Sequence, residues 1–260
     1  HSLFSPHKDF AIPYFLNNKR VDWNEVVKRL QKKGFKKIEL SYRKDDLLEG
    51  FKKTPLSTFV LNLSESQDGL KLMDLFNKKT RNEVKKSLKY DFDYKILPVN
   101  EQSLGIFYNL YVKNMQRHGT PAKPKLFFED LFFCFKNKIL ITSIFYKGEL
   151  GGINLSIVEG DNLRLVYNLS EKKFWSYCVN NLLYFKTIEE AADRGIKKID
   201  FGPSVRKDIT HNRFKLGFGA KEIQIVKLTS MSWSLALKCL LEQKLFNLKL
   251  RINKFFLKKV

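Results

Sequence analysis

A mixed α/β fold is predicted for this chain, from the order of its segments and from its apolar content. Strand-like and helix-like segments alternate along the sequence, which is typical of a mixed sheet with helices packed on it. Hydrophobic residues make up 43% of the 260 residues, enough to bury a sizeable core. This composition argues against disorder for most of the chain.

The first segments are a helix and two strands. Residues 21–34 carry apolar side chains at helical spacing, between an N-cap candidate at Asp22 and a stop at Gly34. Residues 57–63 are rich in apolar and β-branched side chains and predict a strand, and residues 36–42 are also expected to form a strand.

The same alternation continues to the C-terminal part. Helices are expected over 68–90 (one or two, basic), 100–119, 126–135 and 179–195. Strands are expected over 93–98, three times within 139–170, and over 197–202 and 222–228. Lys147-Gly148 and Gly160-Asp161 are turn signals for the hairpins between the three central strands.

The tail, residues 234–260, predicts an amphipathic helix. Its apolar face is formed by Leu237, Leu241, Leu245, Leu248, Ile252 and Phe255, and Lys or Arg occupy the opposite face. Such a helix either lies on a membrane surface or packs its apolar stripe onto its own protein.

The chain carries a large excess of positive charge. Lys and Arg number 48 against 27 Asp and Glu, a formal net charge of +21. The resulting field attracts nucleic acid, an anionic membrane surface or a phosphorylated substrate. The alternative is a lysine-rich proteome without a specific anionic partner, because the lysines are spread along the chain.

Several classes of site and segment are disfavoured by what the sequence lacks. It contains no phosphate-binding loop, nucleophile elbow or zinc-protease motif, and no apolar run long enough for a transmembrane helix. Cys134, Cys178 and Cys239 are far apart in the sequence, so we expect neither a disulfide framework nor a metal site. The expected compartment is the reducing cytoplasm. Cys178, near a helix start, is a candidate reactive thiol only if the dipole lowers its pKa. The chain starts without Met, and we expect its natural beginning to be missing.

Four motifs occur in a specific order. Residues 79–87 read KTRNEVKKS, Arg117 precedes a Gly-Thr-Pro turn, Tyr167 ends a strand in VYNLS, and IDFGPS leads to RFKLGFGA at 213–220. Together they resemble the Fem-type aminoacyltransferases, the peptidoglycan cross-bridge enzymes of the acyltransferase superfamily with the GNAT fold. The resemblance covers roughly residues 56–228, and the first section more loosely.

The resemblance implies two GNAT-like α/β domains. The second would span residues 54–229, after a polar run that ends at Pro55. The first, incomplete at its N-terminus, would comprise residues 1–53 and 230–260, with the C-terminal helix returning to complete it.

The resemblance also implies a catalytic pair. Fem-type enzymes move an aminoacyl group from its tRNA ester to an amine, and negative charge develops on the carbonyl oxygen. Lys215 matches the family's lysine that faces this centre, where a preorganised cation stabilises the charge. Phe214 matches a neighbouring aromatic that packs against the terminal adenosine. Gly217 and Gly219 permit close backbone approach. The alternative for Lys215 is a solvated surface lysine.

Five further residues are candidate substrate contacts. By resemblance, Arg117 and Tyr167 hold the acceptor's diphosphate and sugar-peptide portion; otherwise Arg117 offsets a helix dipole and Tyr167 is a core tyrosine. Arg81 and Lys85 share a helix face and contact RNA or phosphate, or form a solvated face. Asp200 orients Lys215 or accepts the amine proton, or makes a structural hydrogen bond.

The donor is expected to be a charged tRNA. Acetyl-CoA-using members of the fold hold the pyrophosphate with a glycine-rich loop at the start of the main helix, but residues 171–183 contain no glycine. This argues against acetyl-CoA and favours either aminoacyl-tRNA or a carrier-bound acyl group as the donor. No metal is expected as a cofactor, because no His or Cys residues stand at ligand spacing. The chain also lacks a long charged helical hairpin, so it resembles the family members without a coiled-coil arm.

The leading function is transfer of an amino acid from aminoacyl-tRNA to an amine of a nucleotide- or lipid-linked peptidoglycan precursor. The expected location is the cytoplasm, or the inner membrane face as a peripheral protein. One alternative is a Fem-like N-acyltransferase acting on an amino sugar of a surface polysaccharide with another activated acyl donor. A second is a non-catalytic RNA- or membrane-binding module.

Overall fold

The computed structural model describes residues 37–42, 52–64, 72–205 and 208–231, with single helical positions at 25, 28, 29, 32 and 241. The chain divides into two compact units. The larger unit comprises residues 57–114 and 124–223, and the smaller unit comprises residues 1–56, 115–123 and 224–260. The expected domain boundaries at 54 and 229 stay a prediction. The apolar stripe of the tail lies outside the described residues apart from position 241.

A mixed sheet forms the centre of the larger unit. Its strands follow the order β2-β7-β6-β5-β4-β3, and β8 pairs with β2. The pairs from β3 to β6 are antiparallel, as is β2 with β7, whereas β6 and β7 run parallel. The strands are β2 (Lys52–Asn62), β3 (Phe92–Leu97), β4 (Ile139–Tyr146), β5 (Glu149–Glu159), β6 (Asn162–Ser170), β7 (Lys198–Asp200) and β8 (Ser204–Val205).

The predicted hairpin turns are present between the central strands. Lys147 and Gly148 both have positive φ, 51° and 81°, as a two-residue turn that follows the strand twist requires. Gly160 has a φ of 60° in the second turn. These turns explain why β4, β5 and β6 form a continuous antiparallel meander.

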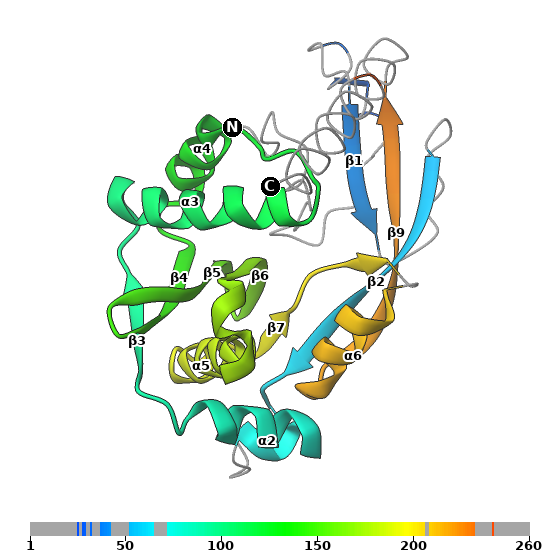
Figure 1. Cartoon of the computed structure of the whole chain (residues 1–260). Coiled ribbons are helices and arrows are strands. Elements are labelled where there is room, and N and C mark those ends of the chain that lie inside the picture. The colour runs from blue at the N-terminus through cyan, green and yellow to red at the C-terminus, as the bar shows by residue number, and fades with distance from the viewer. Residues whose placement is uncertain are drawn as a thin grey trace, which may run out of the picture. The chain divides into compact units, whose positions relative to one another are not determined.

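Helices cover both faces of this sheet, α5 on one and the α3–α4 pair on the other (Figure 1). Neighbouring residues of a strand point to opposite faces of the sheet. In β4, Leu140 and Ile141 are both buried but only Leu140 belongs to the core cluster under α5, so both faces are covered. The helices are η2 (Leu72–Leu75), α2 (Lys78–Ser87), α3 (Glu101–Arg117), α4 (Lys125–Phe135), η3 (Lys172–Tyr177), α5 (Val179–Asp193) and α6 (Ile209–Gly217).

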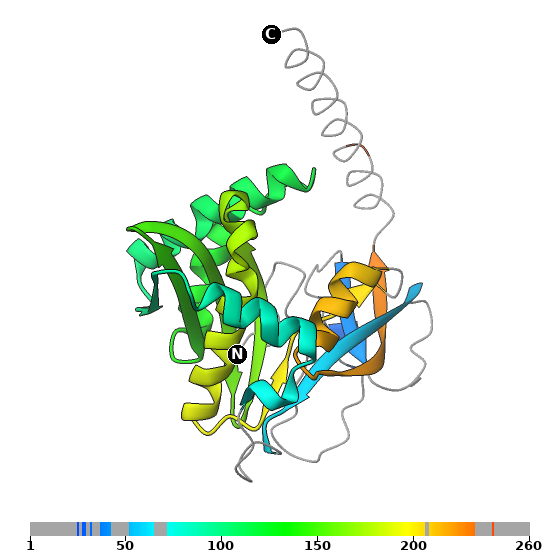
Figure 2. The ribbon, with the colours of Figure 1, turned by 60° about the horizontal axis from the view of Figure 1, so that its bottom comes forward.

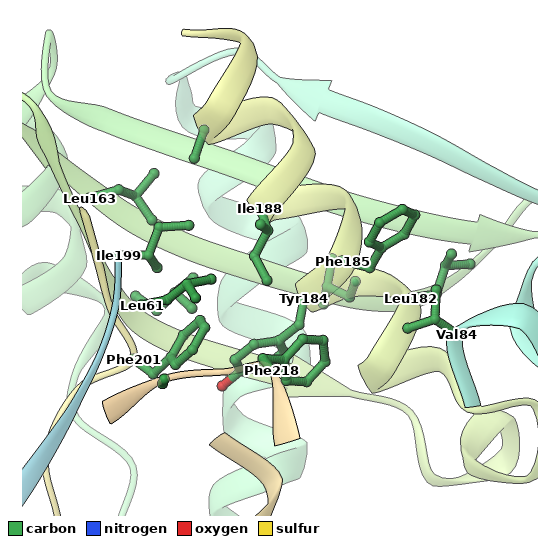
Figure 3. Packing of buried hydrophobic residues seen from close by; sticks show 14 of the residues in the cluster. Leu61, Val84, Leu163, Leu182, Tyr184, Phe185, Ile188, Ile199, Phe201 and Phe218 are labelled. Atoms are coloured by element: carbon green, nitrogen blue, oxygen red, sulfur yellow. The ribbon is translucent and has the colours of Figure 1, made fainter. Parts of the chain in front are cut away.

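The core under α5 extends to the end of α6. Figure 3 shows Tyr184 of α5 beside Phe218, and the two rings stack with centroids 5.4 Å apart. Phe218 also meets Phe76 edge-on at 5.0 Å. Aromatic burial of this kind fixes α6 against α5 and against the residues that precede α2.

The smaller unit contains one described strand pair. β1 (Lys37–Tyr42) runs antiparallel to the second half of β9 (Lys221–Met231), with Lys37 opposite Met231 and Tyr42 opposite Val226. Both strands were expected from the sequence. The described positions between 25 and 32 are helical, in agreement with the helix expected over 21–34.

The mixed α/β fold predicted from the sequence is confirmed. Three elements of the larger unit were not anticipated: the 3-10 helix η3, the short strand β8, and the helix α6, which carries Phe214 and Lys215. Among the residues that the structure describes, no helix is long and apolar enough to cross a bilayer.

Candidate active site

The parallel strands β6 and β7 pair over only three residues each. The last pair joins Arg164 to Asp200, after which β6 continues to Ser170 while the chain leaves β7. Beyond β7, the Phe201 amide donates to the Phe59 carbonyl of β2 at 2.8 Å. The register of β5 and β6 also shifts, so that Val166 is an extra, bulged residue. The two strands therefore diverge just after Asp200.

The Asp200 carboxylate connects the three segments that meet where β6 and β7 diverge. One carboxylate oxygen accepts from Thr58 Oγ1 at 2.5 Å and from the Gly202 amide at 2.9 Å. The other forms an ion pair with Arg164 at 3.0 Å. Since both oxygens are occupied, these contacts favour the structural hydrogen-bonding alternative for Asp200.

Lys215 reaches the same loop from α6. Its ammonium donates to the Gly202 carbonyl at 2.8 Å and to Ser204 Oγ at 2.6 Å, and it lies 5.2 Å from the centre of the Phe59 ring. The residue is only 8% exposed. The alternative of a solvated surface lysine is therefore wrong.

The environment of Lys215 disfavours its charged form. Burial lowers the pKa of Lys215 to about 8, and the nearby carboxylates of Asp200 and Asp208 oppose that shift. Both hydrogen-bond partners named above are neutral oxygens, and an ammonium has three N–H donors. Among the described residues, one N–H of Lys215 is thus left for a further acceptor.

Phe214 points away from Lys215, toward the core and a cavity. Its ring meets Tyr184 at 5.0 Å and Phe218 at 5.3 Å. Consecutive residues of a helix lie about 100° apart around its axis, so the two members of the predicted catalytic pair face different surroundings.

A cavity of about 780 Å³ lies between α2, the start of α5 and α6. We call it the α2–α5–α6 cavity, and Figure 2 shows α2 (teal) running in front of α5 toward α6 (orange). Its lining residues are Asn77, Lys79, Thr80, Glu83, Trp175, Cys178, Asn180, Asn181, Thr210, Arg213, Phe214 and Leu216. Phe214 belongs to this lining and Lys215 does not.

Two glycines allow α6 to approach the elements before it. A Cβ on Gly217 would lie 2.3 Å from Thr80 Oγ1. Gly219 has a φ of +81°, and a Cβ there would lie 2.3 Å from the Leu75 carbonyl oxygen. The close approach expected at these glycines is therefore confirmed, and it is made to the protein's own chain.

Hydrogen bonds fix the cavity walls to one another. The side-chain oxygen of Asn77 caps α2 by accepting from the Thr80 backbone amide at 2.8 Å, and the Asn77 backbone amide donates to the Gly217 carbonyl at 2.9 Å. Asn181 of α5 donates to Glu83 of α2 at 3.0 Å. These contacts join α2 to both neighbouring helices.

Cys178 lies at the junction of η3 and α5. This residue has a φ of 57°, in the left-handed region that glycine adopts without strain. Burial raises the pKa of the Cys178 thiol, although Lys86 opposes the shift. The hypothesis of a thiol with a lowered pKa is therefore wrong.

The remaining predicted contacts are dispersed. Arg81 donates to the Phe76 carbonyl at 2.5 Å, whereas Lys85 is exposed on α2. Tyr167 packs against the aromatic cluster of α3 and α4, 5.6 Å from Phe107, and burial raises its pKa. Arg117 belongs to the smaller unit. The roles of these residues toward a substrate stay predictions.

Sequence reasoning missed several residues that shape the site. Ser204 was quoted only as part of IDFGPS, and Arg213 only as part of RFK, although each is a polar residue next to a recognised motif. Trp175 and Asn180 lie within residues 171–183, which contain no glycine, and no motif marks either of them as a ligand contact. No described group of three His, Cys, Asp or Glu side chains has an arrangement that could hold a metal ion.

Comparison with known proteins identifies the family. A family model described as an acetyltransferase (GNAT) domain matches residues 76–216, more than half of the chain and the segment that contains Lys215. The chain belongs to the GNAT acetyltransferase family. A search of curated protein sequences finds no match.

Solved structures extend the likeness beyond the matched segment. FemX is similar at a TM-score of 0.60 with 11% identity, over 83% of this chain and 78% of that one. L-PGS from Bacillus licheniformis is similar at a TM-score of 0.55 with 11% identity, over 86% of this chain and 77% of that one. A tandem GNAT protein from the clavulanic acid biosynthesis pathway is similar at a TM-score of 0.55 with 9% identity, over 80% of this chain and 68% of that one. At these identities the likeness shows the fold, and that fold is the one predicted from the Fem-type motifs.

Proposed function

We propose that this GNAT acyltransferase moves an amino acid from aminoacyl-tRNA to an amine of a peptidoglycan precursor. The observation that carries the proposal is Lys215, a buried ammonium with an N–H to spare, at the point where β6 and β7 diverge. The fold likeness to FemX and the ordered Fem-type motifs support this reaction over other acyl transfers.

In the proposed reaction, the acceptor amine attacks the ester carbonyl of the donor. A C–N bond forms, the C–O bond to the tRNA ribose breaks, and the proton of the amine passes to the leaving ribose oxygen. The carbonyl oxygen gains negative charge in the transition state, and the third N–H of Lys215 is the donor that stabilises it. A preorganised donor of this kind contributes about 3 kcal/mol.

The α2–α5–α6 cavity supports a polyanionic donor. Lys79 and Arg213 line it, and α2 carries further exposed lysines such as Lys85. At the start of α5, the residue in the left-handed conformation is Cys178, where no glycine-rich pyrophosphate loop is present. This departure favours tRNA over acetyl-CoA.

The proposed acceptor is a nucleotide- or lipid-linked cell-wall precursor. By the family resemblance, Arg117 and Tyr167 hold its diphosphate and sugar-peptide portion. A lipid-linked acceptor would bring this basic protein, with its net charge of +21, to the inner membrane face as a peripheral protein.

A second candidate is a GNAT N-acyltransferase that acylates an amino sugar of a surface polysaccharide. The matched family model, described as an acetyltransferase domain, favours this candidate. It differs from the first in its donor, so a single experiment distinguishes the two.

The test incubates the protein with nucleotide-linked precursors and either pooled charged tRNA or acyl-CoA, and detects the mass increment by mass spectrometry. Aminoacyl transfer that RNase treatment abolishes is the expected result. Lys215→Met should remove turnover and leave RNA binding intact, while Lys138→Met, at an exposed lysine, should change neither. An acyl increment from acyl-CoA alone would overturn the proposal in favour of the second candidate.

A further inference from the structure

The side-chain oxygen of Asn180 is a buried acceptor without a donor. Asn180 is the second residue of α5 and lines the α2–α5–α6 cavity, yet its Oδ1 accepts no hydrogen bond from the described residues. A buried polar atom left unpaired is costly. The last torsion of an asparagine side chain is broad, so a modest turn presents this oxygen to an occupant of the cavity.

Two aromatic side chains of the cavity are fixed in position. Trp175 is 41% exposed, and its indole N–H donates to Ser170 Oγ at 2.8 Å. Phe214 is held by edge-on contacts with Tyr184 and Phe218. Exposed, immobilised rings are stacking platforms for unpaired bases.

The charges of the cavity suit a phosphate-bearing ligand. Lys79 and Arg213 line it and are exposed. Its only described carboxylate, that of Glu83, is engaged by Asn181 and lies 4.0 Å from the Lys79 ammonium. From this lining the cationic surface continues along α2 through Lys78, Lys85 and Lys86 and, beyond the end of α2, to Lys89, all exposed.

We propose that Asn180 is a specificity-determining residue that recognises an unpaired adenine in the α2–α5–α6 cavity. An asparagine amide matches adenine, because its oxygen accepts from the exocyclic N6 amine while its NH₂ donates to N7. The ring stacks on Trp175 or Phe214, and the attached phosphates meet Lys79 and Arg213. The inference rests on the proposed function for the source of the adenosine, the 3′ end of an RNA rather than coenzyme A.

The test compares two RNA hairpins whose single-stranded 3′ overhangs end in adenosine or in inosine, which replaces the N6 amine with a carbonyl. The full chain should bind the adenosine hairpin about tenfold more tightly, as one bidentate base contact predicts. Asn180→Leu should reduce this ratio to about one, whereas Asn109→Leu, at an exposed asparagine of α3, should preserve it. If Asn180→Leu does not fold, Asn180→Asp keeps an acceptor oxygen and should retain the preference at lower overall affinity. A preference for adenosine that Asn180→Leu leaves unchanged would overturn the inference, as would a wild-type ratio near one together with coenzyme A binding that does not depend on Asn180.

A competition experiment with coenzyme A distinguishes failure of this inference from failure of the proposed function. Displacement of the adenosine hairpin should require far more coenzyme A than competing hairpin. If instead coenzyme A binds in an Asn180-dependent manner and both hairpins bind equally, the adenine contact stands and the tRNA donor fails. If the hairpin ratio holds while no aminoacyl transfer occurs, the inference stands and the proposed reaction fails.

Discussion

Lys215 combines burial with neutral hydrogen-bond partners, and this combination sets its chemistry. Ser204 Oγ and the Gly202 carbonyl orient the ammonium without neutralising it. Asp200 acts only from a distance, because Arg164 and Thr58 occupy its oxygens. The charge of Lys215 is therefore available to a substrate oxygen, and it is lost as the pH rises through about 8.

The pH dependence of transfer follows from this electrostatic environment. With a pKa of about 8, Lys215 loses its charge as the pH rises through that value, so kcat/KM should fall about tenfold per pH unit above it. Lys215→Arg, which stays charged, should lower the rate and remove this falling limb. A wild-type profile that keeps rising above pH 9 would contradict the role of Lys215 as a cation.

Stability should depend on pH through the same residue. The folded-state pKa lies below the ordinary value of 10.5, so between about pH 8 and 10.5 the unfolded chain binds more protons and Lys215 makes stability rise with pH. Below pH 8 its burial costs roughly 3 kcal/mol. Lys215→Met lacks this dependence, so its unfolding free energy minus that of the wild type should be most positive near neutral pH and decrease toward pH 10. Urea titrations across this range would measure it, and a constant difference would contradict the lowered pKa.

At the scale of elements, the contact of α6 with α2 depends on the absence of side chains at two glycines rather than on charge. Gly217 and Gly219 bring the end of α6 against Thr80 and Leu75, and the α2–α5–α6 cavity is bounded by the same helices. A change at the glycines should therefore alter both stability and the shape of the cavity.

Gly217→Ala should destabilise the protein by about 1–3 kcal/mol, because the new methyl group would meet Thr80 Oγ1. Adding Thr80→Ala removes that oxygen and should restore part of the loss, which a double-mutant cycle of unfolding free energies would detect. Gly105→Ala in α3 is the matched control, since nothing lies within 4 Å of its added Cβ, and it should stabilise by up to about 1 kcal/mol. Equal effects at the two glycines would refute the packing argument.

The elements that the sequence predicted well are those with a clear period or turn signal. The helix α3, whose buried Leu104, Phe107 and Tyr111 recur at helical spacing, and the hairpins of β4 to β6 are set by local patterns that tertiary packing reinforces. α6 was missed because its nine residues are mostly polar and end in glycine. Its start depends on one side chain, that of Asp208, which accepts from the His211 amide at 3.2 Å.

The candidate site was less predictable than the fold, because it depends on contacts between distant segments. Lys215 and Phe214 could be named from a motif, but nothing in RFK reveals that their side chains face different surroundings. The burial of Lys215 depends on Gly202 and Phe59, far from it in sequence. Asn180 carries no sequence signal at all, since its importance lies in a missing partner.

At the scale of the molecule, the charge of +21 becomes informative where lysines gather on one element. Of the ten residues of α2, four are lysines, and Lys78, Lys79, Lys85 and Lys86 are all exposed. Elsewhere in the larger unit, some exposed lysines are paired with acids, as Lys173 is with Glu149. A polyanion that follows α2 would reach the cavity directly.

Salt should weaken tRNA binding steeply if α2 carries the phosphate contacts. The double substitution Lys85→Ala/Lys86→Ala should lower affinity and reduce the slope of log K against log salt concentration by about 1–2. Lys136→Ala/Lys138→Ala removes the same charge from exposed positions after α4 and should leave the slope nearly unchanged. Filter binding over a salt series measures both, and equal reductions in the two variants would mean that the charge acts only through the overall field.

Cys178, whose backbone has a left-handed conformation, allows ligand binding in the cavity to be measured without an assay of aminoacyl transfer. Its thiol is half-buried in the wall of the cavity, whereas Cys134 is exposed on α4. Alkylation of Cys178, slow because of its raised pKa, should become slower still when RNA fills the cavity, with Cys134 as the internal standard. Peptide mass mapping would then report occupancy, so the protein carries a built-in footprinting probe beside the site where its donor is proposed to bind.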